Sequence, residues 1–236
     1  MEGFELGTES LAKSSVIQMV KSALGLIPGM APVVDLYSNY QQNVQYNNIV
    51  DVLQKHSEQI RFISDNLIDK LYVNSPLYAK DLLITLQKAK DEFNEEKRMV
   101  FASYLTACCH TENSNNQNKD LFLDYIAKLD FIDIFILQNL SKHYNGKNIV
   151  EYSTSKYNVE HEIKVSKLDI QIHVEHLSAI GVIERCDKED VDRFNRRFGN
   201  IQTREKSFNK LNLYQRTYLG DGIYSFLRKA EPQKMI

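Results

Sequence analysis

Residues 45–71 read QYNNIVDVLQKHSEQIRFISDNLIDKL, and this stretch decides the fold class. Its apolar side chains recur at intervals of three and four residues, which is the period of one helix face. His56 completes the apolar stripe between Leu53 and Ile60. The spacing therefore predicts a long amphipathic helix over residues 45–71, with His56 in line with the apolar side chains.

A second helical stripe begins at Pro76 and extends to about Cys109. Proline at the first turn of a helix costs no hydrogen bond, so Pro76 marks the expected start. Two more helices are expected at residues 120–129 and 130–144, after a polar loop at 111–119. The apolar stripe of the second long helix comprises Leu82, Leu86, Ala89, Phe93, Val100 and Tyr104.

The composition agrees with a helical protein. The chain has 236 residues, of which 43% are hydrophobic and 25% are charged, and a chain of this kind buries a core rather than remaining disordered. The formal net charge is −2, so a partner attracted by charge would have to meet a local patch. Only 9 glycines and 4 prolines are present, which disfavours a turn-rich β-sandwich or a glycine-looped nucleotide fold.

The pattern changes toward the C-terminus. A short helix is predicted over residues 165–180, and Gly181 would end it as a C-cap. A strand at 182–184, a returning strand at 213–219 and a final helix at 220–229 follow, which together give the element order of a winged helix. The residues expected to face the core are Leu168, Ile172 and Leu177 on the first of these helices and Ile223, Phe226 and Leu227 on the last.

We therefore predict a mainly α-helical protein with two domains. Residues 1–112 would form an N-terminal helical hairpin and a bundle of long helices. Residues 113–236 would form a C-terminal winged-helix-like domain with a small β-hairpin.

The least polar run of the chain lies at residues 23–34, ALGLIPGMAPVV. It is shorter than the roughly twenty apolar residues that a spanning helix needs, and its glycines and prolines would break one helix into a hairpin. Such a hairpin would pack in the core or a subunit interface, or it would insert into a bilayer. The candidate membrane or interface residues are Leu24, Leu26, Ile27, Met30, Val33 and Val34.

His173 and His176 are the candidate metal ligands, because residues three apart share a helix face and imidazole binds zinc well. A third ligand would have to come from Asp169, His161 or Cys186, and no established zinc spacing is present. We therefore predict a polar helix face in contact with DNA or water rather than a metal site. Two carboxylate pairs could in principle hold a metal, Asp130 with Asp133 and Glu160 with Glu162, but surface pairs of this kind are usually solvated.

A basic series near the C-terminus is opposed only by Glu205. Phosphate backbones favour such a patch, and interleaved phenylalanines would stack on bases or anchor a hairpin to its domain. The candidate nucleic-acid contacts are Arg193, Arg196, Arg197, Arg204, Lys206, Lys210 and Arg216.

The three cysteines do not form a disulfide framework. Cys108 and Cys109 are adjacent and Cys186 is distant, which suits a reducing cytoplasm. No Gly-x-Ser-x-Gly motif, no cysteine with a local base and no glycine-rich phosphate loop is found, so we predict a non-enzymatic protein without a cofactor. We expect a cytoplasmic protein that associates with the membrane on activation if the hairpin is the effector.

Four stretches carry a resemblance to a known family. They are DEFNEEKR at 91–98 with FASYL at 101–105, KLDFIDIFIL at 128–137, LSAIGVIE at 177–184, and TYLG at 217–220. Together they resemble the abortive infection alpha proteins of bacteria. The resemblance covers somewhat over half of the chain.

This resemblance implies a role in phage defence, in which the infected cell is lost or arrested, and it brings no catalytic residues to transfer. The chain departs from the family where Asp221 and Gly222 follow the TYLG turn and in the long segment 185–212. We predict a non-enzymatic antiphage defence protein of abortive-infection type that acts through a protein partner or the inner membrane. The alternatives are a winged-helix nucleic-acid-binding regulator and a structural homo-oligomer.

Overall fold

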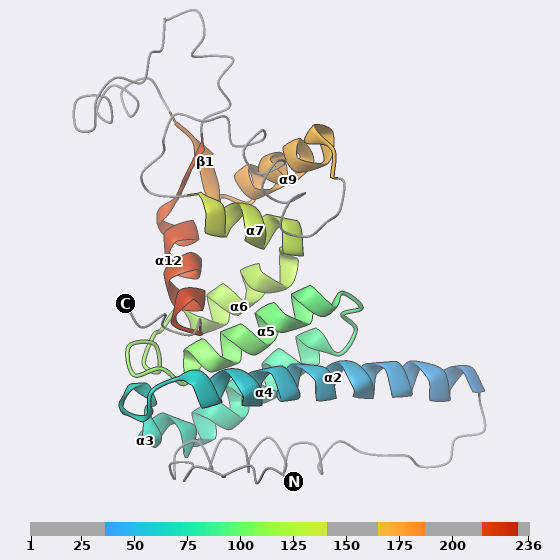
Figure 1. Cartoon of the computed structure of the whole chain (residues 1–236), viewed down its shortest axis with the longest axis vertical. Helices are drawn as coiled ribbons and strands as arrows, with labels where there is room; N and C mark the ends of the chain where they lie inside the picture. Colours follow the sequence, from blue (N-terminus) through green and yellow to red (C-terminus); the bar gives the residue numbers. More distant parts are fainter. Residues whose placement is uncertain (1–35, 141–164, 187–213, 231–236) are drawn as a thin grey trace, which may run out of the picture. The chain divides into compact units, whose positions relative to one another are not determined.

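The computed structural model describes residues 36–140, 165–186 and 214–230 (Figure 1). The chain divides into two compact units, and each is described by itself below. Unit 1 comprises residues 1–128 and 225–236, and unit 2 comprises residues 129–224. The described residues are mainly helical with one two-stranded antiparallel sheet, as the sequence predicts at this level.

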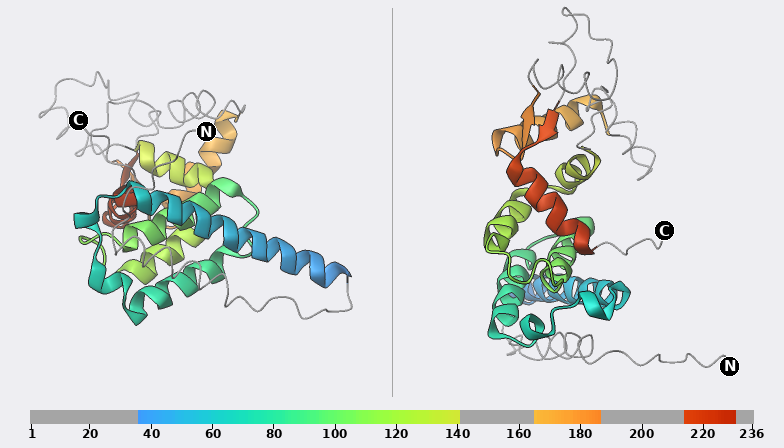
Figure 2. Two further views of the ribbon diagram at one scale, coloured as in Figure 1. Left: turned by 60° about the horizontal axis from the view of Figure 1, so that its bottom comes forward. Right: turned by 90° about the vertical axis from the view of Figure 1, so that its left-hand side faces the viewer.

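Unit 1 is built around α5, most of whose residues are buried. Helices α2, α4 and α6 all contact α5, and Figure 2 shows them grouped around it. The helices of this unit are α2 (Leu36–Phe62), α3 (Lys70–Val73), α4 (Pro76–Ala89), α5 (Glu95–Cys108) and α6 (Lys119–Lys128), with 3-10 turns at Asp65–Leu67 and Arg228–Ala230.

The helix predicted over residues 45–71 is shorter at its C-terminal end than expected, because α2 ends at Phe62. The chain beyond it pairs with a distant segment: Ile68 forms an isolated antiparallel bridge with His110. Asp69 then caps α3 by accepting hydrogen bonds from the next backbone N–H groups. The predicted position of His56 is confirmed, since its side chain is completely buried.

The helix predicted over residues 76–109 is in fact two helices. Asn94 interrupts it, because its side chain accepts a hydrogen bond from the Lys97 backbone N–H and so begins α5 as an N-cap. Phe93, which was expected in the apolar stripe, is 78% exposed just before this break. A local cap therefore overrides the longer apolar period.

Residues 113–128, predicted to belong to the C-terminal domain, lie in unit 1. Helix α6 buries Phe122, Leu123 and Ile126. Phe122 also meets Phe226 edge-to-face at 5.5 Å between ring centroids, which ties α6 to the C-terminal residues of the same unit.

Unit 2 contains α7 (Phe131–Asn139), α9 (Lys167–Ala179), β1 (Ile183–Arg185), β2 (Tyr214–Arg216) and the first part of α12 (Tyr218–Leu227). The strands are antiparallel, with Ile183 opposite Arg216. Gly181 adopts a φ of +74° directly after α9, so the expected glycine C-cap is confirmed.

The predicted inward face of α9 is mostly wrong. The buried residues are Ile170, Val174 and Leu177, whereas Leu168 and Ile172 are 69% and 57% exposed. Both sets follow a helical period, so the spacing alone did not distinguish them.

The turn between β2 and α12 depends on a close backbone approach. The Thr217 hydroxyl donates to the Gly181 carbonyl at 2.7 Å, and the Thr217 N–H donates to the Val182 carbonyl at 3.1 Å. A side chain at Gly220 would collide with that same Val182 carbonyl oxygen. The predicted core residues of the last helix are confirmed: Ile223, Phe226 and Leu227 are all buried.

Candidate functional site

A carboxylate and two imidazoles meet between α7 and α9 in unit 2. The Asp133 side chain is fully buried, and its two oxygens each lie 2.9 Å from one histidine. Oδ1 contacts Nδ1 of His173, and Oδ2 contacts Nδ1 of His176. Oδ2 also accepts a hydrogen bond from the Asp130 backbone N–H at 2.8 Å. Three groups therefore meet one buried carboxylate.

Local sequence explains this arrangement. Asp130 is the N-cap of α7, and Asp133 stands three residues later, where its carboxylate reaches back to the N-cap N–H. His173 and His176 stand three apart on α9 and so share a face. Because α7 contacts α9, both rings meet the same carboxylate.

The burial of Asp133 has an electrostatic consequence. A buried carboxylate is costly unless it is paired and hydrogen-bonded. The hydrogen bond to Asp133 raises the pKa of His173 above its ordinary value, while burial of the imidazole opposes this rise. The His173 and His176 side chains keep 18% and 37% of their surface exposed, so solvent reaches this cluster from the α9 side.

The same place holds three side chains that could bind a metal ion. Asp130, Asp133 and His173 each offer a ligand atom, and these atoms lie within 4.8 Å of one another. The sequence pattern indicated the two carboxylates and the two histidines only as separate pairs. Their combination was missed because 40 residues separate Asp133 from His173.

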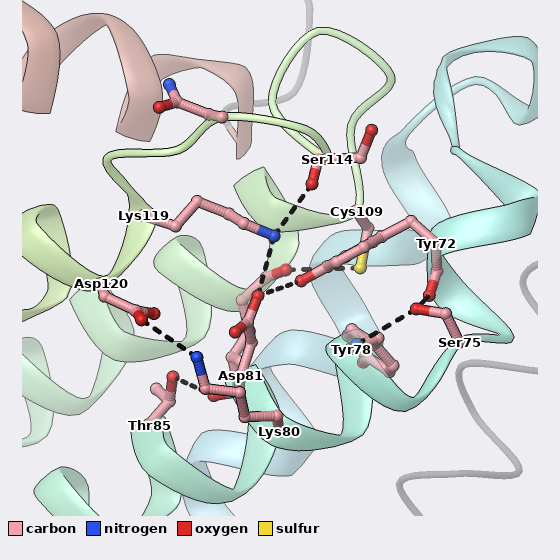
Figure 3. A network of polar contacts seen from close by, with 12 residues as sticks. Tyr72, Ser75, Tyr78, Lys80, Asp81, Thr85, Cys109, Ser114, Lys119 and Asp120 are labelled. Atoms are coloured by element: carbon pink, nitrogen blue, oxygen red, sulfur yellow. Dashed lines mark hydrogen bonds and ion pairs between the residues drawn. The ribbon is translucent and has the colours of Figure 1, made fainter.

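A second polar cluster lies inside unit 1 (Figure 3). Asp81, only 4% exposed, lies 2.8 Å from the Lys119 Nζ and accepts a 2.5 Å hydrogen bond from the Tyr72 hydroxyl. The Lys119 ammonium also donates to the Ser114 carbonyl oxygen at 2.9 Å and lies 4.0 Å from the centre of the Tyr72 ring. Every charge in this cluster is matched internally, which suits a structural role.

His56 lies in the same core without a charged partner. Its ring nitrogens lie 2.8 Å from the Thr106 and Tyr78 hydroxyl oxygens. Burial lowers the pKa of His56 to about 3, so the ring is neutral in the folded protein. Burial likewise raises the pKa of the Cys108 thiol to about 12, which keeps it protonated.

An apolar surface lies on α3 and α4, and we call it the α3–α4 face. It consists of Leu71, Leu77 and Leu83, which are 87%, 61% and 63% exposed. On α4 the exposed positions Leu77, Lys80 and Leu83 fall on one side of the helix, opposite the buried residues. The predicted apolar stripe includes the buried Leu82 and leaves out Leu77 and Leu83, in agreement with the exposure of these two side chains.

Most of the residues predicted to contact membrane or nucleic acid, from Leu24 to Val34 and from Arg193 to Lys210, lie outside the described residues. Arg216 is described, and its side chain is only 5% exposed. It donates to the Asp221 carboxylate at 2.9 Å and to the Leu137 carbonyl oxygen at 3.0 Å. Its guanidinium also stacks 3.8 Å from the Tyr224 ring centre, so this arginine joins elements of unit 2.

Within residues 36–140, 165–186 and 214–230, none of the helices is both long enough and apolar enough to span a membrane. Comparison with protein-family models found no match, and comparisons with curated proteins and with solved structures found no significant match.

Proposed function

We propose that this chain is a non-enzymatic antiphage defence protein of abortive-infection type that acts by binding a protein partner. The class of function comes from the resemblance to the abortive infection alpha proteins. The observation that supports a binding role is the α3–α4 face, because three large leucine side chains stay exposed on two successive helices and exposed apolar surface is typical of protein interaction sites.

The composition of this face favours a protein over a lipid surface. Helices that lie on membranes combine a broad apolar face with many lysines and arginines. The exposed residues of α4 instead include two leucines and only two cations, Lys80 and Lys88, and each of these lysines is paired with a carboxylate of α6.

The experiment is a phage-plating assay in bacteria that express the chain. A Leu77→Asp, Leu83→Asp double variant places two charges on the α3–α4 face. We expect the double variant to lose protection, so that the plaque count rises at least about tenfold over that of the wild type. Its unfolding midpoint should not change, because both side chains are already exposed. The matched control is Gln54→Asp, which adds a charge to an exposed position of α2.

Equal protection by the double variant and the wild type would contradict the role of the α3–α4 face. Absence of protection by the wild type against every phage tested would contradict the defence function itself. Dye leakage from anionic liposomes, abolished by polar substitutions at Leu26, Ile27 and Val33, would favour the membrane as the target.

A winged-helix-like unit 2 that binds nucleic acid is the second candidate. The order of α9, β1, β2 and α12 supports it, because a helix followed by a two-stranded sheet is the winged-helix order. DNA affinity that falls steeply with salt and is lost in an Arg196→Glu, Arg197→Glu variant would support this candidate. A mass that rises with protein concentration would instead favour the structural homo-oligomer.

A further inference from the structure

We propose that Asp130, Asp133 and His173 bind one divalent transition-metal ion at the N-terminal end of α7. The three side chains come from two helices of unit 2, and their ligand atoms lie within 4.8 Å of one another. The site does not depend on the α3–α4 face, which belongs to unit 1.

The donor set indicates the class of ion. Two carboxylates and an imidazole match zinc and manganese, because imidazole suits transition metals while calcium and magnesium prefer oxygen ligands alone. The two carboxylates would balance the two positive charges of the ion. Three protein ligands leave at least one coordination position for water or another ligand.

The surroundings of the three ligands are those of an oriented site. Asp133 is fully buried and held by the Asp130 N–H and by His176, so its carboxylate cannot turn away. Asp130 is exposed and His173 is partly exposed, which gives an ion a route from solvent. His176 is then a positioning residue that supports Asp133 from its other oxygen.

Metal binding must displace the hydrogen between His173 and Asp133 if the ion takes the nitrogen that now faces Asp133. The Nδ1 of His173 is 2.9 Å from Oδ1, and one of these two atoms holds the hydrogen between them. When the ion binds, a neutral imidazole carries its hydrogen on Nε2 instead, and only an imidazolium loses a proton to solvent.

The test uses the full chain stripped of metal and titrated with Zn²⁺ against a chromophoric chelator. We expect the wild type to bind one Zn²⁺ per chain. In Asp130→Asn and in His173→Gln the Zn²⁺ affinity should fall at least about tenfold or be lost. Asparagine keeps the N-cap, and glutamine keeps a donor for Asp133, so both variants should fold, as circular dichroism will check. The control, Glu175→Gln, removes an exposed carboxylate of the same helix and should bind Zn²⁺ like the wild type.

A second readout is thermal unfolding, since a ligand that binds only the folded state raises the melting temperature. Zn²⁺ should raise it in the wild type and in Glu175→Gln, and not in Asp130→Asn. Three results would overturn the proposal: no Zn²⁺ binding by the wild type, undiminished binding by Asp130→Asn, or binding of Mg²⁺ or Ca²⁺ at least as tightly as Zn²⁺. None of them bears on phage protection, so the two proposals can fail separately.

Discussion

Each of the two units places one buried carboxylate at the centre of a polar cluster, but the partners of that carboxylate differ. In unit 1, Asp81 is paired with the ammonium group of Lys119. In unit 2, Asp133 is paired with two imidazoles, those of His173 and His176.

Solvent access follows the same division. The Lys119 and Asp81 side chains are 12% and 5% exposed, so the unit 1 cluster is closed. The cluster in unit 2 opens to solvent through its histidines and through Asp130. A buried carboxylate can therefore be closed off from solvent or left open to it, and the residues paired with it decide which.

The largest effect is expected when Asp81 is replaced by alanine. Asp81→Ala leaves the Lys119 ammonium and the Tyr72 hydroxyl buried without their acceptor, which should cost about 3–5 kcal/mol of unfolding free energy. Denaturant unfolding of the full chain measures this. The exposed pair Lys80–Asp120, whose side chains are 52% and 63% exposed, is the control, and Asp120→Ala should cost less than about 1 kcal/mol. Similar costs for the two variants would show that burial does not distinguish the pairs.

The next effect concerns backbone packing in unit 2, where no charge is involved. Gly220→Ala drives a methyl group into the Val182 carbonyl, and overpacking of this kind costs about 3 kcal/mol. Loss of hydrogen-exchange protection in β1 and α12 would measure this destabilisation. Gly181→Ala is the matched variant: nothing lies near its added methyl, so only its φ of +74° opposes it, at about 1 kcal/mol. A larger cost for Gly181→Ala than for Gly220→Ala would contradict the close approach of Gly220 to the Val182 carbonyl oxygen.

Acid should weaken unit 1 through His56. The folded-state pKa of about 3 is below the ordinary value of 6.5, so the unfolded chain takes up a proton first as the pH falls. The contribution of His56 is therefore complete above pH 6.5 and is lost progressively between pH 6.5 and about 3. Between pH 7.5 and 4.5 the loss amounts to about 2.5 kcal/mol.

The measurement is the difference in pH dependence between the wild type and His56→Gln, because the carboxylates titrate alike in both proteins. The glutamine does not titrate, so its unfolding free energy should fall less steeply with acid. Parallel curves for the two proteins would mean that His56 is not held neutral by burial.

The smallest of these effects is expected for the carboxylate of unit 2. Asp133→Ala deprives the Asp130 N–H and two imidazoles of their acceptor, but the partly exposed rings regain hydrogen bonds to water. We expect a cost of about 2 kcal/mol, below that of Asp81→Ala, when metal is removed by a chelator. Hydrogen exchange in α7 and α9 is the readout. A cost equal to that of Asp81→Ala would remove the distinction between a closed and an open cluster.

The sequence predicted best what depends on neighbours within about one turn. The burial of His56 followed from its place between Leu53 and Ile60, and the Gly181 cap followed from the end of the apolar pattern. The C-terminal helix and its buried Phe226 were predicted in the same way. The Asn94 cap was not predicted, because the apolar period continues through it.

The remaining errors depend on partners far along the chain. The helix predicted to reach residue 71 stops at Phe62, and the segment after it pairs through Ile68 with His110. The candidate site is of the same kind, since Asp133 and His173 are brought together only by the packing of α7 on α9.

The sequence by itself determined that the protein is mainly helical and where most of its helices begin. Periodicity and capping are local, so they can be read from a single chain. Only the tertiary structure decided that α9 buries Ile170 and Val174 rather than Leu168 and Ile172, because both pairs follow the same four-residue period. The physical reason is that burial depends on which helix lies opposite, and that helix is chosen by packing over the whole unit.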